Sequence, residues 1–517
     1  MYRTLSAALT LLALAGCNAW NLPDDNYAWL DAATWDPAVV AAKDGVYVRL
    51  PQAGQLVRVD KDGTTTPVDL DGAAPESLLL APDQETLLVR ATWPIGTDDD
   101  PKIKHLSDCP EDAIETGNEI DLVRDGARVG TLGDVPEQFN RITYSDDGTL
   151  GVAYLDFSNS SEVDINGSLN LTQVSFFEMA DGTVHNVTVG FAAENVLFTP
   201  GDPRAVVLSR SEVAVVDLST FDVTVTYPLT LDPDLVVVPT DVALTPDGRY
   251  AMVSVAGQAD LYVLDLSQES IDLVELNGVP SDLLVDAEHD RTIIVYASQS
   301  QVDVLDHAYF ELTSVDLDEP ATNVLGVDGQ ALLYNGSGSY HDVYLFDVAT
   351  DTVVEYRAEN PVMEMYLTAN QAYAVATLNR ESSTGSGVSG FYDQYYGLDI
   401  FDLTTDRNPT ALALEGQPLG LALVEDDTEN HALVLVEGLD DVLNIDLFDG
   451  SDTPISLTEP PLGITASPEG QFIITESSHA GILAFLDPAT NAVTEVAGFA
   501  LTGILHDDTL PRRGEEN

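Results

Sequence analysis

One stretch, residues 239–276, recurs along the chain and limits what the chain can fold into. It contains four short apolar runs, rich in Val, Leu and Tyr, that are separated by Gly, Pro and Asp. Such runs are typical of β-strands, and connections of a few residues between them favour antiparallel hairpins. Copies of this unit bury their faces against one another only when they are stacked. The sequence therefore predicts an all-β fold, a β-propeller of four-stranded antiparallel blades.

An aspartate near the end of the third run marks successive copies of the unit. Seven such aspartates are separated by 41 to 55 residues, which is the length of one propeller blade. We expect each side chain to cap the turn after its strand. About ten units lie within residues 38–505, so we expect 7–10 blades, as one ring or with a second, smaller domain. The markers are Asp217, Asp265, Asp306, Asp347, Asp402, Asp446 and Asp487.

The first 37 residues lie outside the predicted propeller. A short apolar stretch within residues 1–16 ends at Leu14-Ala15-Gly16-Cys17. This motif resembles the lipobox of bacterial lipoprotein precursors, which implies cleavage of a signal peptide, acylation of Cys17 and a lipid anchor in the cell envelope. Asn18 differs from the Asp of an inner-membrane retention signal, which favours the outer membrane. An ordinary signal peptide with a coincidental Cys is the alternative. Residues 17–37 then form a lipidated tether, and residues 506–517 form a polar tail.

The blade unit also resembles a known repeat. Residues 239–250 read PTDVALTPDGRY, and residues 461–470 repeat the pattern with Glu469 in place of the second Asp. This resembles the P-x-x-(V/I)-x-x-(S/T)-P-D-G-x-x repeat of YVTN-type and WD40-like bacterial propellers, although the YVTN tetrapeptide and Trp-Asp pairs are absent. The resemblance covers nearly the whole mature chain and implies blade geometry rather than a particular chemistry.

The charge of the chain argues against several kinds of partner. It has 87 acidic and 20 basic residues, for a net charge of −67. Binding to nucleic acid through surface charge is therefore not expected. Abundant Asp and scarce Lys resemble halophile-adapted surfaces, because at 1 M salt the Debye length falls to about 3 Å. An acidic surface kept soluble by charge alone is the alternative.

Three units carry insertions, and all three lie between the second and third strands of the unit. They span residues 94–118, 158–170 and 379–396. Antiparallel strands place all second-to-third connections on one side of the disc, together with the connections between blades. We call this side the insertion-bearing face. Insertions confined to one face of a repeat array often mark a binding face, although tolerated surface insertions are the alternative.

The insertion-bearing face contains the candidate binding residues. One insertion offers aromatic contact groups, a second offers an acidic run with a histidine, and two scarce cations lie nearby. The arginines could hold an anionic ligand or pair with acidic neighbours. The candidates are Phe391, Tyr392, Asp393, Tyr395 and Tyr396 in the first, Asp98, Asp99, Asp100 and His105 in the second, and the cations Arg210 and Arg380.

Motifs for catalysis and metal binding are missing from the sequence. The eight histidines have no metal-ligand spacing, no acidic run completes a calcium loop, and no nucleophile or nucleotide motif occurs. We therefore expect no metal, no cofactor and no catalytic residue. The interpretation is a monomeric, lipid-anchored binding or scaffold module for an envelope protein, peptide or glycan. The alternatives are a periplasmic, lactonase-like hydrolase or quinoprotein-like oxidoreductase with a site over the central channel, and a purely structural envelope component.

Overall fold

A computed structural model gives the fold. It describes residues 39–50, 54–95, 115–133, 139, 141–145, 147–156, 171–232, 235–327, 329–380, 392, 394–405, 407–425, 430–468, 470–476 and 481–499. Within these ranges, no helix has the length and apolar character needed to cross a bilayer. The predicted signal sequence, tether and tail fall outside them.

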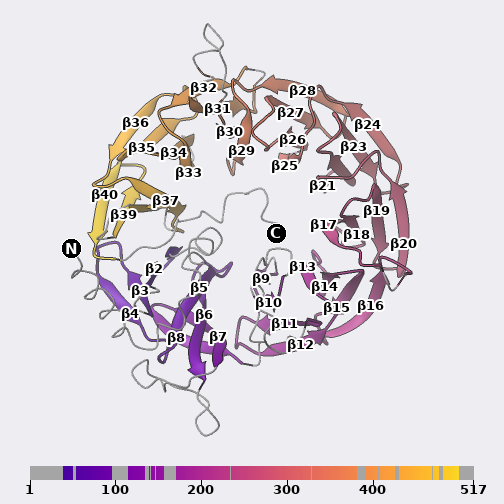
Figure 1. Cartoon of the computed structure of the whole chain (residues 1–517), viewed down its shortest axis with the longest axis horizontal. Helices are drawn as coiled ribbons and strands as arrows, with labels where there is room; N and C mark the ends of the chain where they lie inside the picture. The colour runs from indigo at the N-terminus through magenta and orange to yellow at the C-terminus, as the bar shows by residue number, and fades with distance from the viewer. Residues whose placement is uncertain are drawn as a thin grey trace, which may run out of the picture.

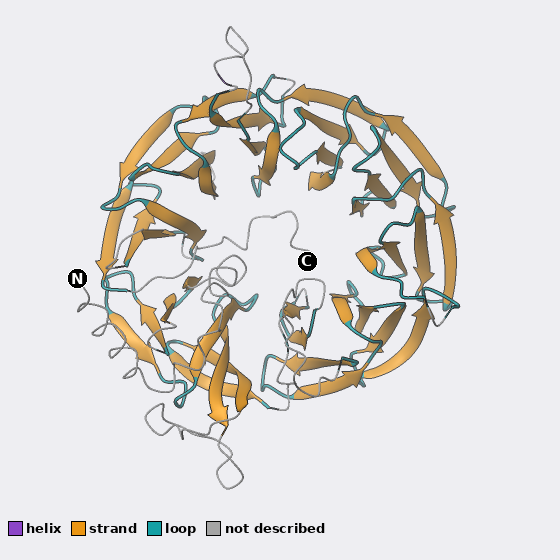
Figure 2. Cartoon of the chain, in the orientation of Figure 1, coloured by secondary structure: helices purple, strands orange, loops and turns teal. Residues whose placement is uncertain are grey.

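The strands form ten four-stranded antiparallel sheets, arranged as the ten blades of one closed ring (Figures 1 and 2). The predicted fold is therefore confirmed at ten blades, and all forty described strands belong to the one ring. In each blade the first strand lies nearest the central channel and the fourth lies at the rim (Figure 1).

The forty described strands follow one another along the chain, four to a blade. Blades 1 to 5 comprise β1 (Val39–Ala42), β2 (Gly45–Leu50), β3 (Gln55–Val59), β4 (Thr65–Val68); β5 (Ala74–Leu80), β6 (Leu87–Ile95), β7 (Glu115–Arg124), β8 (Ala127–Leu132); β9 (Arg141–Tyr144), β10 (Leu150–Tyr154), β11 (Gln173–Glu178), β12 (Val184–Thr188); β13 (Ala193–Phe198), β14 (Arg204–Ser209), β15 (Glu212–Asp217), β16 (Asp222–Pro228); β17 (Pro239–Leu244), β18 (Tyr250–Val255), β19 (Asp260–Asp265) and β20 (Ser270–Glu275). Blades 6 to 10 comprise β21 (Asp282–Asp286), β22 (Arg291–Val295), β23 (Gln301–Asp306), β24 (Leu312–Asp316); β25 (Asn323–Val327), β26 (Gln330–Tyr334), β27 (Asp342–Asp347), β28 (Thr352–Arg357); β29 (Val362–Leu367), β30 (Tyr373–Leu378), β31 (Tyr396–Asp402), β32 (Thr410–Leu414); β33 (Pro418–Glu425), β34 (Asn430–Val436), β35 (Asp441–Asp446), β36 (Asp452–Ser456); β37 (Pro461–Ala466), β38 (Phe472–Glu476), β39 (Ile482–Asp487) and β40 (Ala492–Ala497).

Strand position within a blade explains the hydrophobic pattern. The second strand β14 reads RAVVLS and is buried from its second residue onward, because both of its faces pack on neighbouring blades. The outermost strand β16 reads DVTVTYP, and its side chains alternate between exposed and more buried positions. Continuous apolar runs therefore correspond to middle strands, and alternating runs to the rim.

Apolar packing between blades closes the ring. Ten hydrophobic clusters each join one blade to the next, so every interface in the ring has its own core. The closing cluster packs Val48 and Val57 of blade 1 with Leu483 and Phe485 of blade 10. Blades 1 and 10 are each built from four consecutive strands, so the described strands close the ring without an exchanged strand. Residues 500–505, the end of the predicted propeller, lie outside the described residues.

The turns of the repeat behave as predicted. All seven marker aspartates accept a backbone N–H two or three residues later, such as the 2.9 Å bond from Ser267 to Asp265. In the T-P-D-G turn of blade 5, Gly248 has a φ of 64°. A Cβ at this position would come within 2.4 Å of the Thr199 Cγ2 atom, so the turn requires glycine.

The insertions lie between the second and third strands of blades 2, 3 and 8, as predicted, but two are shorter than expected. β6 continues to Ile95 and β7 begins at Glu115, with Pro94 paired to Thr116, so the blade 2 insertion is residues 96–114. The sequence suggested residues 94–118, but β6 continues through Pro94 although proline is uncommon inside a sheet. At blade 8, Tyr396 is the first residue of β31 and therefore belongs to the sheet.

Candidate functional site: the insertion-bearing face

The structure describes only part of the predicted binding set. Tyr392, Tyr395, Tyr396, Arg210 and Arg380 are described, and they fall into two places on the insertion-bearing face, blade 8 and blade 4. The remaining candidates lie outside the described residues and stay predictions: Cys17, Asp98, Asp99, Asp100, His105, Phe391 and Asp393.

The foot of the blade 8 insertion is fixed to the connection between blades 7 and 8. Asn360 lies in that connection and is only 2% exposed. Its Nδ2 atom donates to the carbonyl oxygens of Tyr392 at 2.9 Å and Tyr395 at 3.0 Å. The Asn379 N–H donates to the Pro361 carbonyl oxygen at 2.8 Å. The connection thus holds the chain on both sides of the insertion.

A buried carboxylate orients the same connection. Asp399 of β31 accepts the Glu359 N–H at 2.8 Å through its Oδ2 atom. Burial raises the pKa of Asp399 to about 6, against the opposing effect of that hydrogen bond. In blade 7 the Glu319 N–H donates to the Tyr344 hydroxyl at 2.7 Å in the equivalent way. Asp399 is therefore a positioning group that belongs to the repeat.

Aromatic groups at this foot combine fixed and accessible surfaces. The Tyr392 hydroxyl donates to the Ala411 carbonyl oxygen at 3.5 Å. The guanidinium of Arg380 lies over the Tyr396 ring, 5.2 Å from its centroid. Tyr395 is 38% exposed on an anchored backbone. An aromatic side chain presented in this way offers contact area at a small cost in conformational entropy.

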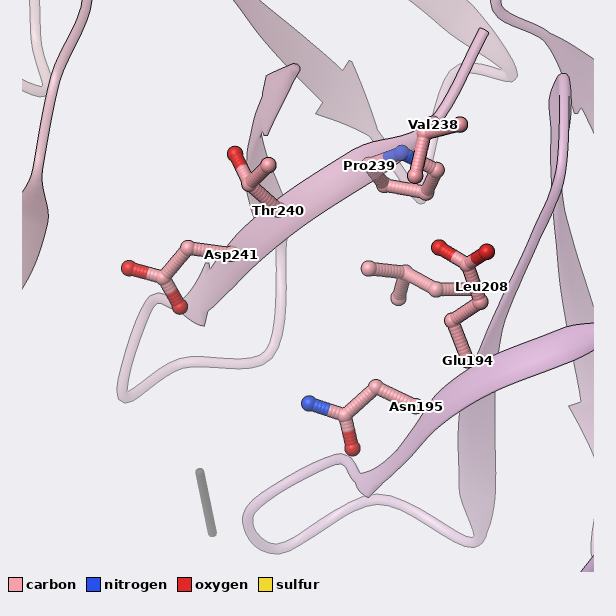
Figure 3. Close-up of a pocket in the computed structure, with 7 residues that line it drawn as sticks. All are labelled: Glu194, Asn195, Leu208, Val238, Pro239, Thr240 and Asp241. Carbon is pink, nitrogen blue, oxygen red and sulfur yellow. The ribbon is translucent and has the colours of Figure 1, made fainter. Parts of the chain in front are cut away.

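The second place is a pocket of about 180 Å³ between blades 4 and 5. Figure 3 shows the Glu194 side chain rising from β13 toward Pro239 on β17. Arg210 donates through Nε to Glu194 Oε1 at 2.8 Å, so this scarce cation faces a carboxylate. Burial raises the pKa of Glu194, whereas Arg210 lowers it. The pocket lining is Glu194, Asn195, Leu208, Val238, Pro239, Thr240 and Asp241.

Some carboxylates near the start of the first strand of a blade accept hydrogen bonds from backbone N–H groups. Asp282 Oδ1 accepts the Leu283 N–H at 3.0 Å, and Asp282 Oδ2 accepts the Val324 N–H of blade 7 at 2.8 Å. These bonds satisfy N–H groups on strand edges that face the channel. In the described ranges, no group of three or more His, Cys, Asp or Glu side chains is arranged to hold a metal ion.

The site residues predicted from the sequence did not include Asn360, Glu194 or Asp241. Asn360 acts from the connection between blades 7 and 8, and Glu194 of β13 pairs with Arg210 in the same blade. Spacing along the chain carries no signal for either contact. Asp241 was visible, but only as part of the repeat motif. One signal was available: Glu194 of blade 4 and Thr240 of blade 5 occupy the same position in their repeat units, and the glutamate is the charged residue of the two.

Comparisons with known proteins find solved structures that are similar at low sequence identity and with TM-scores below 0.5. No protein-family model matches the chain, and no curated protein does. The dihydro-heme d1 dehydrogenase NirN in complex with DHE is 12% identical over 64% of this chain and 72% of its own, with a TM-score of 0.39. The hydrazine synthase of Kuenenia stuttgartiensis is 17% identical over 59% and 95%, with a TM-score of 0.35. A eukaryotic initiation factor is 14% identical over 73% and 88%, with a TM-score of 0.47. At these values the similarity carries no argument about activity. The class that the fold defines is a ten-bladed β-propeller.

Proposed function

We propose that this propeller is a non-catalytic binding module that is lipid-anchored through Cys17 in the bacterial cell envelope, at the outer membrane. Its blade 8 insertion holds an envelope protein, peptide or glycan. The observation that carries the proposal is the double hydrogen bond from buried Asn360 to Tyr392 and Tyr395, because it fixes the base of an aromatic insertion on a rigid disc. Rigid scaffolds that present loops are suited to recognition.

The binding test uses the domain from residue 18 onward in 1 M NaCl. Removal of residues 381–391 leaves Asn379, Tyr395 and Tyr396 in place, so the foot and the sheet are kept. A matched variant lacks residues 96–114 of blade 2. A partner retained from envelope extract by the parent and the blade 2 variant, but lost by the blade 8 variant, supports the proposal after its affinity is measured with purified partner. Equal retention by all three proteins contradicts it.

The anchor is tested separately with the full chain. Metabolic labelling with a radioactive fatty acid should mark the parent chain and fail to mark a Cys17→Ser variant. Membrane fractionation should move the variant from the outer-membrane fraction to the soluble fraction, because a lipid-anchored chain depends on its acyl groups for attachment. An unlabelled parent chain would contradict the lipoprotein proposal and leave the binding proposal untouched.

A further inference from the structure

Exposed apolar side chains gather on the insertion-bearing face around blade 4. Phe191, in the connection between blades 3 and 4, is exposed. The connection between blades 4 and 5 presents Leu231, which is 96% exposed, and the exposed side chains of Leu235 and Val236. We call these four side chains the apolar sector. A group of exposed apolar side chains on a soluble domain marks a contact with another molecule or with a membrane.

Hydrogen bonds join the two connections that carry the apolar sector. The Arg210 N–H donates to the Phe191 carbonyl oxygen at 3.0 Å, and the Ser211 N–H donates to the Val237 carbonyl oxygen at 2.7 Å. The Val237 N–H donates in turn to the Ser211 hydroxyl at 2.9 Å. The turn at Arg210 and Ser211 therefore holds both connections, and the apolar sector is one fixed piece of surface.

The connection between blades 4 and 5 also satisfies part of its own backbone. It is the longest connection between blades, at residues 229–238, compared with residues 358–361 between blades 7 and 8. The Asp232 N–H donates to the Thr230 hydroxyl at 3.1 Å, and the Leu235 N–H donates to the Asp232 carbonyl oxygen at 3.1 Å. Backbone groups that are already bonded cost less free energy when they leave water. This connection is therefore suited to entering the boundary between water and lipid.

The path of the chain favours lipid as the partner of this face. Val39 begins β1, and the first strand of every blade starts on the insertion-bearing face, where the connections between blades lie. The proposed anchor at Cys17 precedes Val39, and residues 18–38 reach at most about 70 Å when fully extended. The tether therefore leaves the disc from the face that carries the apolar sector. This step rests on the lipid anchor of the proposed function.

The charge of the chain decides which lipid surface fits. With a net charge of −67, the chain is repelled by anionic lipids wherever salt does not screen the charges. Asp232, next to Leu231, adds a carboxyl group to the same connection, so the leucines enter only as far as the headgroup region. A zwitterionic lipid surface offers the apolar boundary without the repulsion.

We propose that the apolar sector inserts into the headgroup region of a zwitterionic lipid surface, so that blades 3 to 5 touch the membrane. Blade 8 lies on the other side of the ring (Figure 1), so its insertion stays clear of the bilayer and available to its own partner. The contact is made by side chains of the disc and needs no acyl group. It sets the orientation of the disc on the membrane.

The test is flotation of the domain from residue 18 onward with phosphatidylcholine vesicles in 1 M NaCl. This domain lacks Cys17, so acylation plays no part in the result. The test variant combines Leu231→Ser, Leu235→Ser and Val236→Ser. The matched control combines Tyr309→Ser and Phe448→Ser, because these exposed aromatic side chains lie in turns after third strands, on the opposite face.

We expect the parent to float with the vesicles and the triple variant to lose at least about ten-fold in its partition coefficient, because three apolar contacts are removed. The urea midpoint of the triple variant should equal that of the parent, since the replaced side chains are exposed. The control should float as the parent does. Phosphatidylglycerol vesicles in 0.1 M NaCl should retain less of the parent than phosphatidylcholine vesicles do.

Absent flotation of the parent, equal losses in both variants, or a triple variant that floats as the parent does would each overturn the proposal. Retention of an envelope protein through the same side chains, without flotation, would also overturn it and assign the apolar sector to a polypeptide. Stronger binding to phosphatidylglycerol at low salt would overturn the choice of a zwitterionic surface. Flotation of the domain together with an unlabelled full chain would support the apolar sector and contradict the anchor, so the two failures are distinguishable.

Discussion

Replacement of Asn360 by alanine should loosen the foot of the blade 8 insertion. The side chain is 2% exposed and donates to two carbonyl oxygens, at 2.9 and 3.0 Å. Each hydrogen bond contributes about 0.5–1.5 kcal/mol net, so their loss should cost about 1–3 kcal/mol. Because the carbonyls belong to Tyr392 and Tyr395, most of this cost should appear as local opening of residues 392–396. At 1.4 kcal/mol per factor of ten, amide exchange there should accelerate about five- to 140-fold.

The assay is hydrogen exchange by mass spectrometry, together with urea denaturation of the same samples. Asn335→Ala is the matched control, because Asn335 is also 2% exposed and donates to the Pro320 carbonyl oxygen at 2.9 Å in blade 7, which lacks an insertion. The control should lower the urea midpoint by a similar amount and leave exchange at residues 392–396 unchanged. Unchanged exchange in Asn360→Ala, or equal acceleration in both variants, would refute the anchoring role of Asn360.

Three further predictions concern the ring and its charge. Phe485→Ala should lower the free energy of unfolding by about 3–5 kcal/mol in urea denaturation, because Phe485 is buried in the cluster that closes the ring; a loss below about 1 kcal/mol would mean that closure lies elsewhere. Burial raises the pKa of Glu476 to about 7, so the folded state holds this proton more tightly than the unfolded state does. Melting temperatures of the parent should therefore fall as pH rises from about 4.5 to 7, and Glu476→Gln should flatten that slope, whereas parallel slopes would contradict the assignment. Raising NaCl from 0.1 to 2 M should increase the urea midpoint, because screening relieves repulsion in a chain of net charge −67; a flat series would contradict adaptation to a saline habitat.

The fold was predictable because its signals are local. Each blade is four consecutive strands, so turn residues and apolar runs within about 40 residues determine it. The marker aspartates and the T-P-D-G turn make their hydrogen bonds within a few residues of themselves. The sequence constrained the number of blades in the ring less strongly. This number depends on the packing angles between neighbouring blades, whose facing surfaces are all rich in Val, Leu and Ile.

For the candidate site, the sequence predicted the face of the disc on which it lies but not the contacts within it. Strand direction alone places the three insertions together, and the structure bears out their position between second and third strands. The pairing of Arg210 with Glu194, and of Asn360 with Tyr392, joins residues that share no motif. The first contact joins β13 to the β14–β15 turn within blade 4, and the second starts from the connection between blades 7 and 8.

A β-bulge lies near the start of the first strand in several blades, and the residues at this bulge can be compared between blades. Six blades have a register shift at this position, and the bulged residues differ in size and polarity, so the backbone requires no particular side chain there. Glu194 alone among them combines a buried carboxylate with an unpartnered oxygen in the described structure. Because an apolar residue meets the same backbone need in three other blades, stability does not explain a buried charge at blade 4. Glu194 pairs with Arg210 at 2.8 Å, and the half-buried Glu76 pairs with Arg90 at 3.3 Å, so a neighbouring arginine faces the carboxylate in both bulges. The bulged residues are Glu76, Glu194, Thr240, Met363, Leu419 and Leu462.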